Sequence, residues 1–404
     1  MTGAGQTRRA FLAAAGTAVV GSLAGCQSEF DPLASTGLDE HAATQFRQGP
    51  LNQGYQDVSV PASVTEAWSV PANRGDHTAA KGSPALTPDG DVVLADDTGR
   101  VRRLSPDGEV RWATTITEAT RGSHGTAAIA NDTAYVGTYD GALSALDLET
   151  GQRRWRTELG DAIGASPTYY NGTLYTAVEH AAPSGSLVAV DAASGEVQWR
   201  DGWPTNHPHS TAALDVERGR LLFGSNDGKV YTWSFPDLER EWTYDTGGDV
   251  KAPIPIADGV AVVPSWAATV TALDVADGSV RWEFQTGQDN MCAPAVHDGT
   301  VYVGSHDDNV YAIDLATGEE EWRFETGGWV IGSVVATPEH VLVGSYDTHL
   351  YALDRADGSE TWRFEGRGHA TSAPLVTEAA VYYAERAVNG ESDTPGLCYK
   401  LGPT

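Results

Sequence analysis

The sequence predicts an all-β fold, an eight-bladed β-propeller whose blades are four-stranded antiparallel sheets. A tryptophan recurs with gaps of 44, 43, 44, 43, 40, 40 and 40 residues. Short β-rich runs separated by Asp-Gly and Thr-Gly turns fill each interval, and helical periodicity is absent from the repeats. A repeat of this length indicates a radial array of small sheets, each packed against its neighbours. The recurring residues are Trp68, Trp112, Trp155, Trp199, Trp242, Trp282, Trp322 and Trp362.

The segment from Cys292 to Trp322 shows what one repeat contains. Its strand-like runs cover residues 293–297, 300–305, 309–313 and 320–324, with turn-rich breaks between them. Branched side chains in the middle runs suit a pleated, packed face, and the glycines after Asp298 and Thr317 supply the positive φ that tight turns need. Each repeat is therefore expected to form four short strands joined by three turns.

Five repeats share the pattern Ala-[Leu/Val/Ile]-Asp-x-x-x-Gly-x-x-x-Trp, ending at Trp155, Trp199, Trp282, Trp322 and Trp362. The small alanine lets a neighbouring sheet approach, the aspartate bonds turn amides, and the tryptophan buries a large ring with one N–H to satisfy. These features predict that all eight tryptophans dock neighbouring blades together.

This pattern resembles the tryptophan-docking repeat of the pyrroloquinoline-quinone (PQQ)-like propeller family, which includes PQQ dehydrogenases and outer-membrane assembly factors of the BamB type. The resemblance extends from Trp68 to Leu401. It implies the fold, whereas the docking motif builds blades and does not itself bind the quinone.

The two ends of the repeat region predict how the ring closes. Trp68 has no strands before it, and residues 372–401 have no tryptophan after them. Residues 66–70 would therefore supply the outer strand of an eighth blade, which would remove the exposed edges of an open array. The propeller is expected to span residues 66–404, and its terminal closure matches the family resemblance.

Residues 1–25 are expected to form a twin-arginine signal peptide that ends in a lipobox. The Arg8-Arg9 pair precedes a short apolar stretch, and Leu23-Ala24-Gly25-Cys26 follows at once. Cys26 would become a lipidated N-terminus, so the protein would be extracytoplasmic and anchored to the cell membrane without spanning it. The alternative is an accidental arginine pair before an alanine-rich helix.

Residues 26–65 are poor in regular pattern and are expected to form a tether. Within it, residues 45–54 resemble the leader that often precedes PQQ-like propellers. This resemblance implies that the leader lies along the ring.

The chain carries a formal net charge of −29, and its lysines are Lys81, Lys229, Lys251 and Lys400. Such a composition resembles the acidic, lysine-poor surfaces of haloarchaeal proteins; the alternative is an ordinary acidic secreted protein. Nucleic acid is not expected as a partner, because binding phosphates needs clustered basic residues. Cys292 and Cys398 are expected to be buried thiols on different blades and not a disulfide.

Aligning the repeats predicts a ring of polar side chains around one mouth of the central channel. The loop that leads into each innermost strand lies on the same face as the hairpin between the second and third strands. A pocket there for a small ligand is one interpretation; ordinary polarity of loop tips is the other. No metal is predicted, because the histidines are spread over separate blades. The candidate ligand ring is Lys81, His124, His209, Lys251, Asn290, Trp329 and His369.

These observations predict a noncatalytic protein-interaction scaffold at the cell surface, with protein partners and without a cofactor. Signatures of hydrolases, zinc proteases, phosphate-binding loops and haem attachment are absent, as are the vicinal cysteines of alcohol-oxidising relatives. The first alternative is a PQQ-dependent quinoprotein dehydrogenase with Ca²⁺, and the second is a solute- or carbohydrate-binding receptor. The partner and the oligomeric state stay open.

Overall fold

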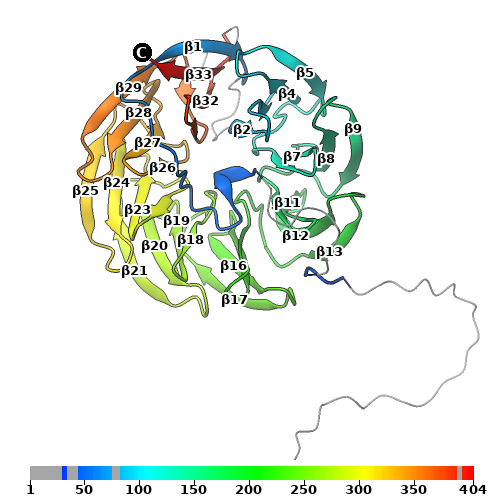
Figure 1. The fold of residues 1–404 in the computed structure, drawn as a ribbon. Coiled ribbons are helices and arrows are strands. Elements are labelled where there is room, and N and C mark those ends of the chain that lie inside the picture. The colour runs from blue at the N-terminus through cyan, green and yellow to red at the C-terminus, as the bar shows by residue number, and fades with distance from the viewer. Residues whose placement is uncertain (1–29, 34–43, 75–81, 389–393) are drawn as a thin grey trace, which may run out of the picture. The chain divides into compact units, whose positions relative to one another are not determined.

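The structure is a computed structural model that describes residues 30–33, 44–74, 82–388 and 394–404. Residues Asp31–Thr404 form one compact unit in which eight antiparallel sheets surround a central channel (Figure 1). In each sheet the first strand lies nearest the channel and the last lies at the rim. The prediction of an all-β, eight-bladed propeller is confirmed. The signal peptide, Cys26 and Lys81 lie outside the described residues.

The first four blades follow the chain in order, four strands to a blade. Blade 1 consists of β2 (Ala85–Leu86), β3 (Val92–Ala95), β4 (Arg100–Leu104) and β5 (Val110–Thr115). Blade 2 consists of β6 (Ala128–Ala130), β7 (Thr133–Gly137), β8 (Ala142–Asp147) and β9 (Arg153–Glu158). Blade 3 consists of β10 (Thr168–Tyr170), β11 (Thr173–His180), β12 (Ser184–Asp191) and β13 (Val197–Asp201). Blade 4 consists of β14 (Ala213–Asp215), β15 (Arg220–Gly224), β16 (Lys229–Ser234) and β17 (Arg240–Asp245).

The next three blades repeat this order, and the last blade takes its outer strand from the N-terminal end of the propeller. Blade 5 consists of β18 (Ile256–Ala257), β19 (Val260–Pro264), β20 (Thr269–Asp274) and β21 (Val280–Gln285). Blade 6 consists of β22 (Ala295–His297), β23 (Thr300–Gly304), β24 (Asn309–Asp314) and β25 (Glu320–Glu325). Blade 7 consists of β26 (Val335–Ala336), β27 (His340–Gly344), β28 (His349–Asp354) and β29 (Glu360–Glu365). Blade 8 consists of β30 (His369–Ala370), β31 (Leu375–Thr377), β32 (Ala380–Arg386), β33 (Leu397–Pro403) and β1 (Val64–Pro71).

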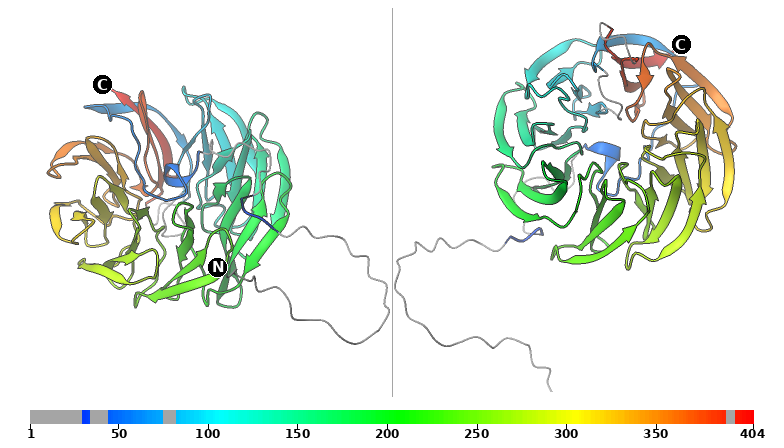
Figure 2. Two further views of the ribbon diagram at one scale, coloured as in Figure 1. Left: turned by 60° about the horizontal axis from the view of Figure 1, so that its bottom comes forward. Right: turned by 180° about the vertical axis from the view of Figure 1, so that it is seen from behind.

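The burial of the strands follows from the stacking of blades around the ring (Figure 2). The second strand of a blade is sandwiched between two neighbouring blades, so every residue of β19 is buried. The outermost strand has one covered face, so β25 alternates and buries Trp322 among exposed charged residues. The core therefore consists of apolar layers between blades, as the branched side chains of the inner strands require.

Strand β1 closes the ring. It pairs antiparallel with β33 from Val64 opposite Pro403 to Pro71 opposite Leu397. The indole N–H of Trp362 then donates to the carbonyl of Pro61 at 2.8 Å, which joins blade 7 to the segment before β1. The predicted closure by an N-terminal strand is confirmed, because β1 pairs the outer side of β33 and completes blade 8.

The docking tryptophans lie in the seams between blades. Seven of the eight indoles donate to a backbone carbonyl of the adjoining unit, and a turn glycine lies beneath six of these rings. Gly318, with φ of +75°, is typical, because an added Cβ would lie 2.7 Å from Cγ of Trp282. Trp199 faces a different turn, in which Leu238 takes the equivalent position with φ of 53°. The seven pairs are Trp68–Pro106, Trp112–Leu148, Trp155–Ala192, Trp242–Val275, Trp282–Leu315, Trp322–Arg355 and Trp362–Pro61.

Residues 44–60, called the leader here, run through the central channel. Thr44 pairs with Ile129 of blade 2, and Tyr55 pairs with Ala336 of blade 7. Between them lies a short 3₁₀ turn, η1 (Phe46–Gln48), visible in blue at the centre of the ring (Figure 1). Within the predicted tether of residues 26–65, the resemblance of residues 45–54 to a propeller leader implies that they lie along the ring, and in the structure they pack against the innermost strands.

The guanidinium of Arg47 holds the leader in place. Its nitrogens donate to the carbonyl oxygens of Asn52 at 2.8 Å and Val334 at 2.9 Å, and also to those of Ala293 and Pro294. Arg47 is 5% exposed, and burial lowers its pKa to about 10. Arg47 thus ties the leader to the inner ends of blades 6 and 7.

Two further expectations concern cysteines and membrane spans. Cys292 and Cys398 are buried free thiols, as predicted. Within the described part of the chain, none of the helical segments has the length and apolar character needed to cross a bilayer.

Candidate functional site

The two faces of the ring differ in the connections that they carry. One face, called the mouth face here, carries the hairpins between second and third strands and the loops that lead into the first strands. The other, called the turn face, carries the remaining tight turns. Successive connections of an antiparallel meander alternate between its two ends, so this division holds for every blade.

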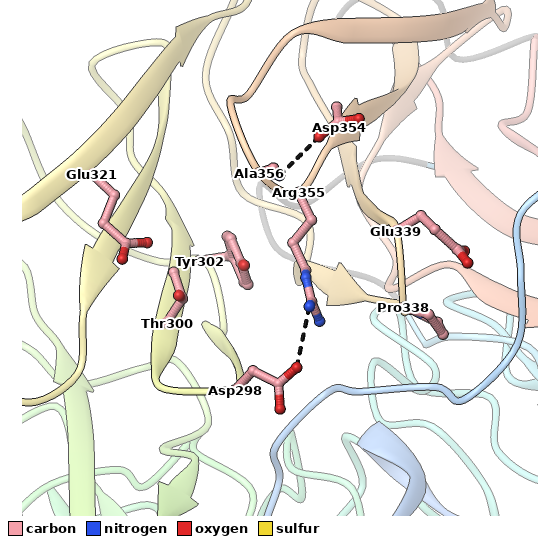
Figure 3. Close-up of a pocket in the computed structure, with 9 residues that line it drawn as sticks. All are labelled: Asp298, Thr300, Tyr302, Glu321, Pro338, Glu339, Asp354, Arg355 and Ala356. Atoms are coloured by element: carbon pink, nitrogen blue, oxygen red, sulfur yellow. Dashed lines mark hydrogen bonds and ion pairs between the residues drawn. The ribbon is translucent and has the colours of Figure 1, made fainter.

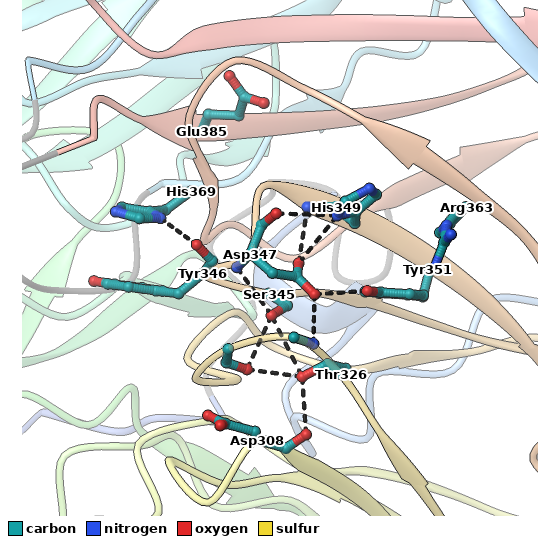
Figure 4. Close-up of polar contacts among 12 residues, drawn as sticks. Asp308, Thr326, Ser345, Tyr346, Asp347, His349, Tyr351, Arg363, His369 and Glu385 are labelled. Atoms are coloured by element: carbon teal, nitrogen blue, oxygen red, sulfur yellow. Dashed lines mark hydrogen bonds and ion pairs between the residues drawn. The ribbon is translucent and has the colours of Figure 1, made fainter.

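A repeated aspartate fixes the hairpins of the mouth face. Asp347 accepts a hydrogen bond from the hydroxyl of Tyr351 at 2.6 Å, from the backbone N–H of Gly327 at 2.6 Å and from that of His349 at 3.0 Å (Figure 4). Asp307 makes the same set of bonds in blade 6. The aspartate therefore does more than shape its own turn, because it also ties the hairpin to the preceding loop.

Aromatic rings line the mouth face over blades 6 to 8. His306 stacks on Trp329 with centroids 5.0 Å apart, Trp329 lies 5.8 Å from Tyr346, and Tyr346 stacks on His369 at 4.1 Å. Arg386 lies over Tyr346 and donates to its hydroxyl at 2.7 Å. We call His306, Trp329, Tyr346, His369 and Arg386 the Trp329 cluster.

The Trp329 cluster combines buried and exposed members. Arg386 is fully buried, whereas Trp329 is 43% exposed. The backbone N–H of Tyr346 donates to the carbonyl of Trp329 at 2.9 Å. Figure 4 shows the second bond, in which Nδ1 of His369 donates to the carbonyl of Tyr346 at 2.6 Å. The exposed indole is thus held in a fixed position on the mouth face.

Next to Arg386 along β32, Glu385 is a fully buried carboxyl group. It accepts hydrogen bonds from the backbone N–H of Gly368 at 3.0 Å and from the hydroxyl of Tyr383 at 3.3 Å. Burial raises its pKa to about 8, against the ordinary glutamate value of 4.5. The carboxyl is therefore largely protonated at neutral pH.

A second polar cluster lies over blades 2 to 4. The carboxylate of Glu179 is 6% exposed and has Nδ1 of His209 at 3.2 Å and Nδ1 of His207 at 3.6 Å. A Cβ on Gly164 would lie 2.7 Å from Nδ1 of His209, 3.0 Å from the hydroxyl of Tyr139 and 3.3 Å from Oε1 of Glu179. We call these five residues the Glu179 cluster.

The charge state of Glu179 depends on its surroundings. Burial raises its pKa, and the positive charges of His207, Arg121 and Lys251 oppose that rise. Within the described ranges, its Oε1 atom is buried and has no hydrogen-bond donor of suitable geometry. The cluster thus brings an acid–base pair to the mouth face.

The structure divides the predicted ligand ring into several environments. His124 packs against Tyr139 at 4.6 Å, and Lys251 lies 3.5 Å from the centroid of Trp266. His209 belongs to the Glu179 cluster; Trp329 and His369 belong to the Trp329 cluster. The predicted residues therefore do not form one continuous ring, and Lys81 lies outside the described residues.

The prediction that Asn290 lines the mouth is wrong, because the residue is fully buried. Its amide nitrogen donates to the hydroxyl of Thr286 at 2.9 Å and to the carbonyl of Thr269 at 3.2 Å. These bonds give Asn290 a structural role within blade 5 and its outgoing loop.

Sequence reasoning missed the hairpin residues of the mouth face. Tyr139, Trp266, His306 and Tyr346 occupy the same hairpin position in blades 2, 5, 6 and 7. Aligning the hairpins as well as the preceding loops would have revealed this aromatic position. Glu179 and Arg386 carry no repeated pattern and could not be found in this way.

A groove of about 550 Å³ lies on the turn face between blades 6 and 7 (Figure 3). Asp298, Glu321, Glu339 and Asp354 give it an acidic lining, and Arg355 bonds to Asp298 across it at 3.1 Å. Within the described ranges, no group of three His, Cys, Asp or Glu side chains is placed to hold a metal ion.

The repeats match a family model described as outer membrane protein assembly factor BamB, over residues 97–200, 183–294 and 289–395. These segments cover more than half of the chain. The chain belongs to this family. Its PQQ-like repeat and BamB-like resemblance, inferred above from the docking motif, are thereby confirmed.

Two curated relatives illustrate the range of the family. BamB of Yersinia pestis is 26% identical over 174 residues, which cover 39% of this chain and 43% of the relative. A polyvinylalcohol dehydrogenase of Sphingopyxis sp. strain 113P3 is 25% identical over 196 residues, which cover 43% of this chain and 28% of the relative. The chain thus spans less than half the length of each.

Solved structures show the same fold at low identity. BamB from Moraxella catarrhalis superposes with a TM-score of 0.64 and 18% identity, covering 84% of this chain and 100% of that one. Quinohemoprotein alcohol dehydrogenase from Comamonas testosteroni gives a TM-score of 0.74 and 14% identity, covering 91% and 81%.

The expectation that the protein takes no cofactor is overturned by these comparisons. Proteins described as dehydrogenases occur among both the sequence relatives and the structural neighbours, and the neighbours include quinohemoproteins. The expectation was based on the missing vicinal cysteines, which are a feature of some dehydrogenases of this fold and not of the fold itself.

Proposed function

We propose that the protein is an extracytoplasmic, lipid-anchored scaffold whose mouth face binds a protein partner. The observation that carries this proposal is the Trp329 cluster, in which an exposed indole is held by neighbouring rings on a rigid rim. Trp, Tyr and Arg are the residue types that dominate binding energy at protein interfaces. The hairpins of the mouth face are preorganised by the repeated aspartate hydrogen bonds. Binding a partner therefore costs little free energy for ordering this surface.

Family membership supports the same function. The matching model and two relatives are described as assembly factors. The proposed anchor depends on the lipobox at Cys26 and the preceding arginine pair. Cys26→Ala should release the protein from the membrane fraction or leave an uncleaved precursor.

Photo-crosslinking on the mouth face tests the scaffold function. A crosslinking residue in place of Trp329 is compared with one in place of Val280, which is 45% exposed on the outer strand of blade 5. In native membranes, the crosslinker at position 329 should give a discrete adduct that the crosslinker at position 280 does not. Identical adduct patterns, or none at either position, would refute the scaffold proposal.

A quinone-dependent oxidoreductase is the second candidate, favoured by the Glu179 cluster. In this role Glu179 and His209 would accept a substrate proton, since their side chains lie 3.2 Å apart at the mouth. Arg121 and Lys251 are the cations near Glu179 that suit the carboxylates of a quinone.

Reconstitution with PQQ, with and without Ca²⁺, tests this candidate. Stoichiometric quinone absorbance and dye reduction with alcohols would support it, and Glu179→Gln should then lower turnover while leaving quinone binding intact. Failure to bind quinone under either condition would rule this candidate out.

A further inference from the structure

Cations of the chain itself cover three aromatic rings of the mouth face. Arg121 lies 5.7 Å from the ring of Tyr139, Lys251 lies 3.5 Å from that of Trp266, and Arg386 lies 5.4 Å from that of Tyr346. The negative face of an aromatic ring attracts such charges. A cation of the chain over an aromatic ring is therefore a repeated feature of the mouth face.

Trp329 departs from this pattern. His306 stacks on it with an interplanar angle of 10°, and Tyr346 lies against it at 38°. Among the residues that the structure describes, no lysine or arginine lies over its ring. Arg386, the cation of this cluster, is buried over Tyr346 instead. The indole most exposed on the mouth face is thus one without a cation from its own chain.

The charges around Trp329 are acidic. Burial lowers the pKa of the neighbouring His306, and the negative charges of Asp289, Asp307 and Asp308 oppose that fall. Burial and the charges of Asp307, Glu325 and Asp347 raise the pKa of Asp308. Asp308 is of special interest because its Oδ1 atom is buried without a hydrogen-bond donor in the described ranges. Its backbone carbonyl, by contrast, accepts from Thr326 (Figure 4). Asp308 as a whole is partly exposed and forms no ion pair within the described ranges, so a cation from outside can approach its carboxylate.

From these observations we infer that Trp329 receives an arginine side chain of the protein partner, with Asp308 as the acceptor for its guanidinium. The inference rests on the scaffold function and names the chemistry of its partner. A guanidinium stacks on an indole and donates several hydrogen bonds at once, which an ammonium does not match. An apolar partner side chain would cover the indole but leave the crowded carboxylates around Asp308 without a counter-charge.

The test uses the full chain labelled with 5-fluorotryptophan, with the Trp329 ¹⁹F resonance assigned from Trp329→Phe. The probe is an acetylated Gly-Arg-Gly amide peptide, and its control carries citrulline, which is neutral and similar in shape. We expect the arginine peptide to shift the Trp329 resonance in a saturable way and to leave that of Trp266 in place, because Lys251 already covers Trp266.

Asp308→Asn supplies the matched variant, since its Oδ1 makes no hydrogen bond within the described protein. Its melting temperature should equal that of the wild type, while the arginine peptide should bind at least about threefold more weakly. Equal shifts with the citrulline peptide, a lack of any shift, or unchanged affinity in Asp308→Asn would overturn the inference.

Failure of this inference can be distinguished from failure of the scaffold function. Adducts from position 329 whose partner segment lacks an arginine would overturn the inference and leave the scaffold intact. The absence of adducts refutes the scaffold, whereas an arginine-specific shift at Trp329 would still support the cation site.

Discussion

The central channel and the mouth face are both rich in polar atoms, but they satisfy them differently. In the channel, the leader supplies a donor for the inner-strand carbonyls that it meets. Arg47 alone reaches carbonyl oxygens that belong to blades 6 and 7 and to the leader itself. On the mouth face, Oδ1 of Asp308 is buried without a hydrogen bond in the described ranges, and Oε1 of Glu179 has Nδ1 of His209 at 3.2 Å, in a geometry unsuited to a hydrogen bond.

This difference separates structure from function. Buried polar groups normally find partners, so a region where the chain pairs its own groups needs no ligand. A region where crowded carboxylates lie beside an exposed indole suits a group from outside the chain. The comparison predicts that substitutions in the channel and seams change stability, whereas those at the Trp329 cluster change binding.

Arg47→Met should show the largest effect on stability. The substitution keeps the apolar stem but leaves several buried carbonyls without a donor, which is expected to cost at least about 3 kcal/mol in free energy of unfolding. Denaturant unfolding of the two proteins measures the difference. Arg323→Met is the control, because its side chain is 59% exposed, bonds to Glu320 and lies over the ring of Tyr311 at the surface. A similar small loss in both variants would show that the leader contributes little to the ring.

The role of Arg47 also marks the limit of the sequence analysis. Blades and ring closure could be predicted because strands, turns and docking tryptophans have local signals that repeat. Arg47 bonds backbone carbonyls, which have no sequence signature, so its role was not predictable. On the mouth face, Trp329 and His369 were found by aligning loops, whereas Glu179 was missed because it lies in no repeated position.

The glycines beneath the docking tryptophans should show the next largest effect. Gly318 and Gly299 have nearly equal φ of 75° and 78°, so alanine is strained at both. A Cβ at Gly318 would lie 2.7 Å from the ring of Trp282, while one at Gly299 meets nothing within 4 Å. Gly318→Ala should therefore cost roughly 1–3 kcal/mol more than Gly299→Ala in thermal unfolding. Equal losses would mean that the seam adapts without cost.

Glu385→Gln should have an effect that depends on pH. The folded pKa of about 8 exceeds the ordinary value of 4.5, so between these values the unfolded state ionises while the folded state keeps its proton. The free energy of unfolding then falls as pH rises, by about 1.4 kcal/mol per pH unit for this group.

Removing this carboxyl should therefore leave the melting temperature unchanged at pH 4 and raise it at pH 8, relative to the wild type. Glu217→Gln serves as the control, because its side chain is 87% exposed. Parallel melting curves for the wild type and Glu385→Gln across pH 4 to 8 would show that Glu385 is not held in its protonated form.

Trp329→Ala should have the smallest effect on stability. Its matched variant is Trp282→Ala, which removes the same side chain from a seam where it is 7% exposed and donates to the carbonyl of Leu315 at 2.8 Å. Loss of a buried tryptophan costs about 3–5 kcal/mol, whereas a surface substitution usually stays within about 0.5 kcal/mol. Chemical denaturation of both variants, followed by circular dichroism, measures the two values. If Trp329→Ala were destabilised as much as Trp282→Ala, the Trp329 cluster would be part of the fold and the distinction between the channel and the mouth face would fail. If Trp329→Ala is as stable as the wild type, the Trp329 side chain contributes little to folding. A role in binding a partner is then the remaining explanation for an indole held on the mouth face.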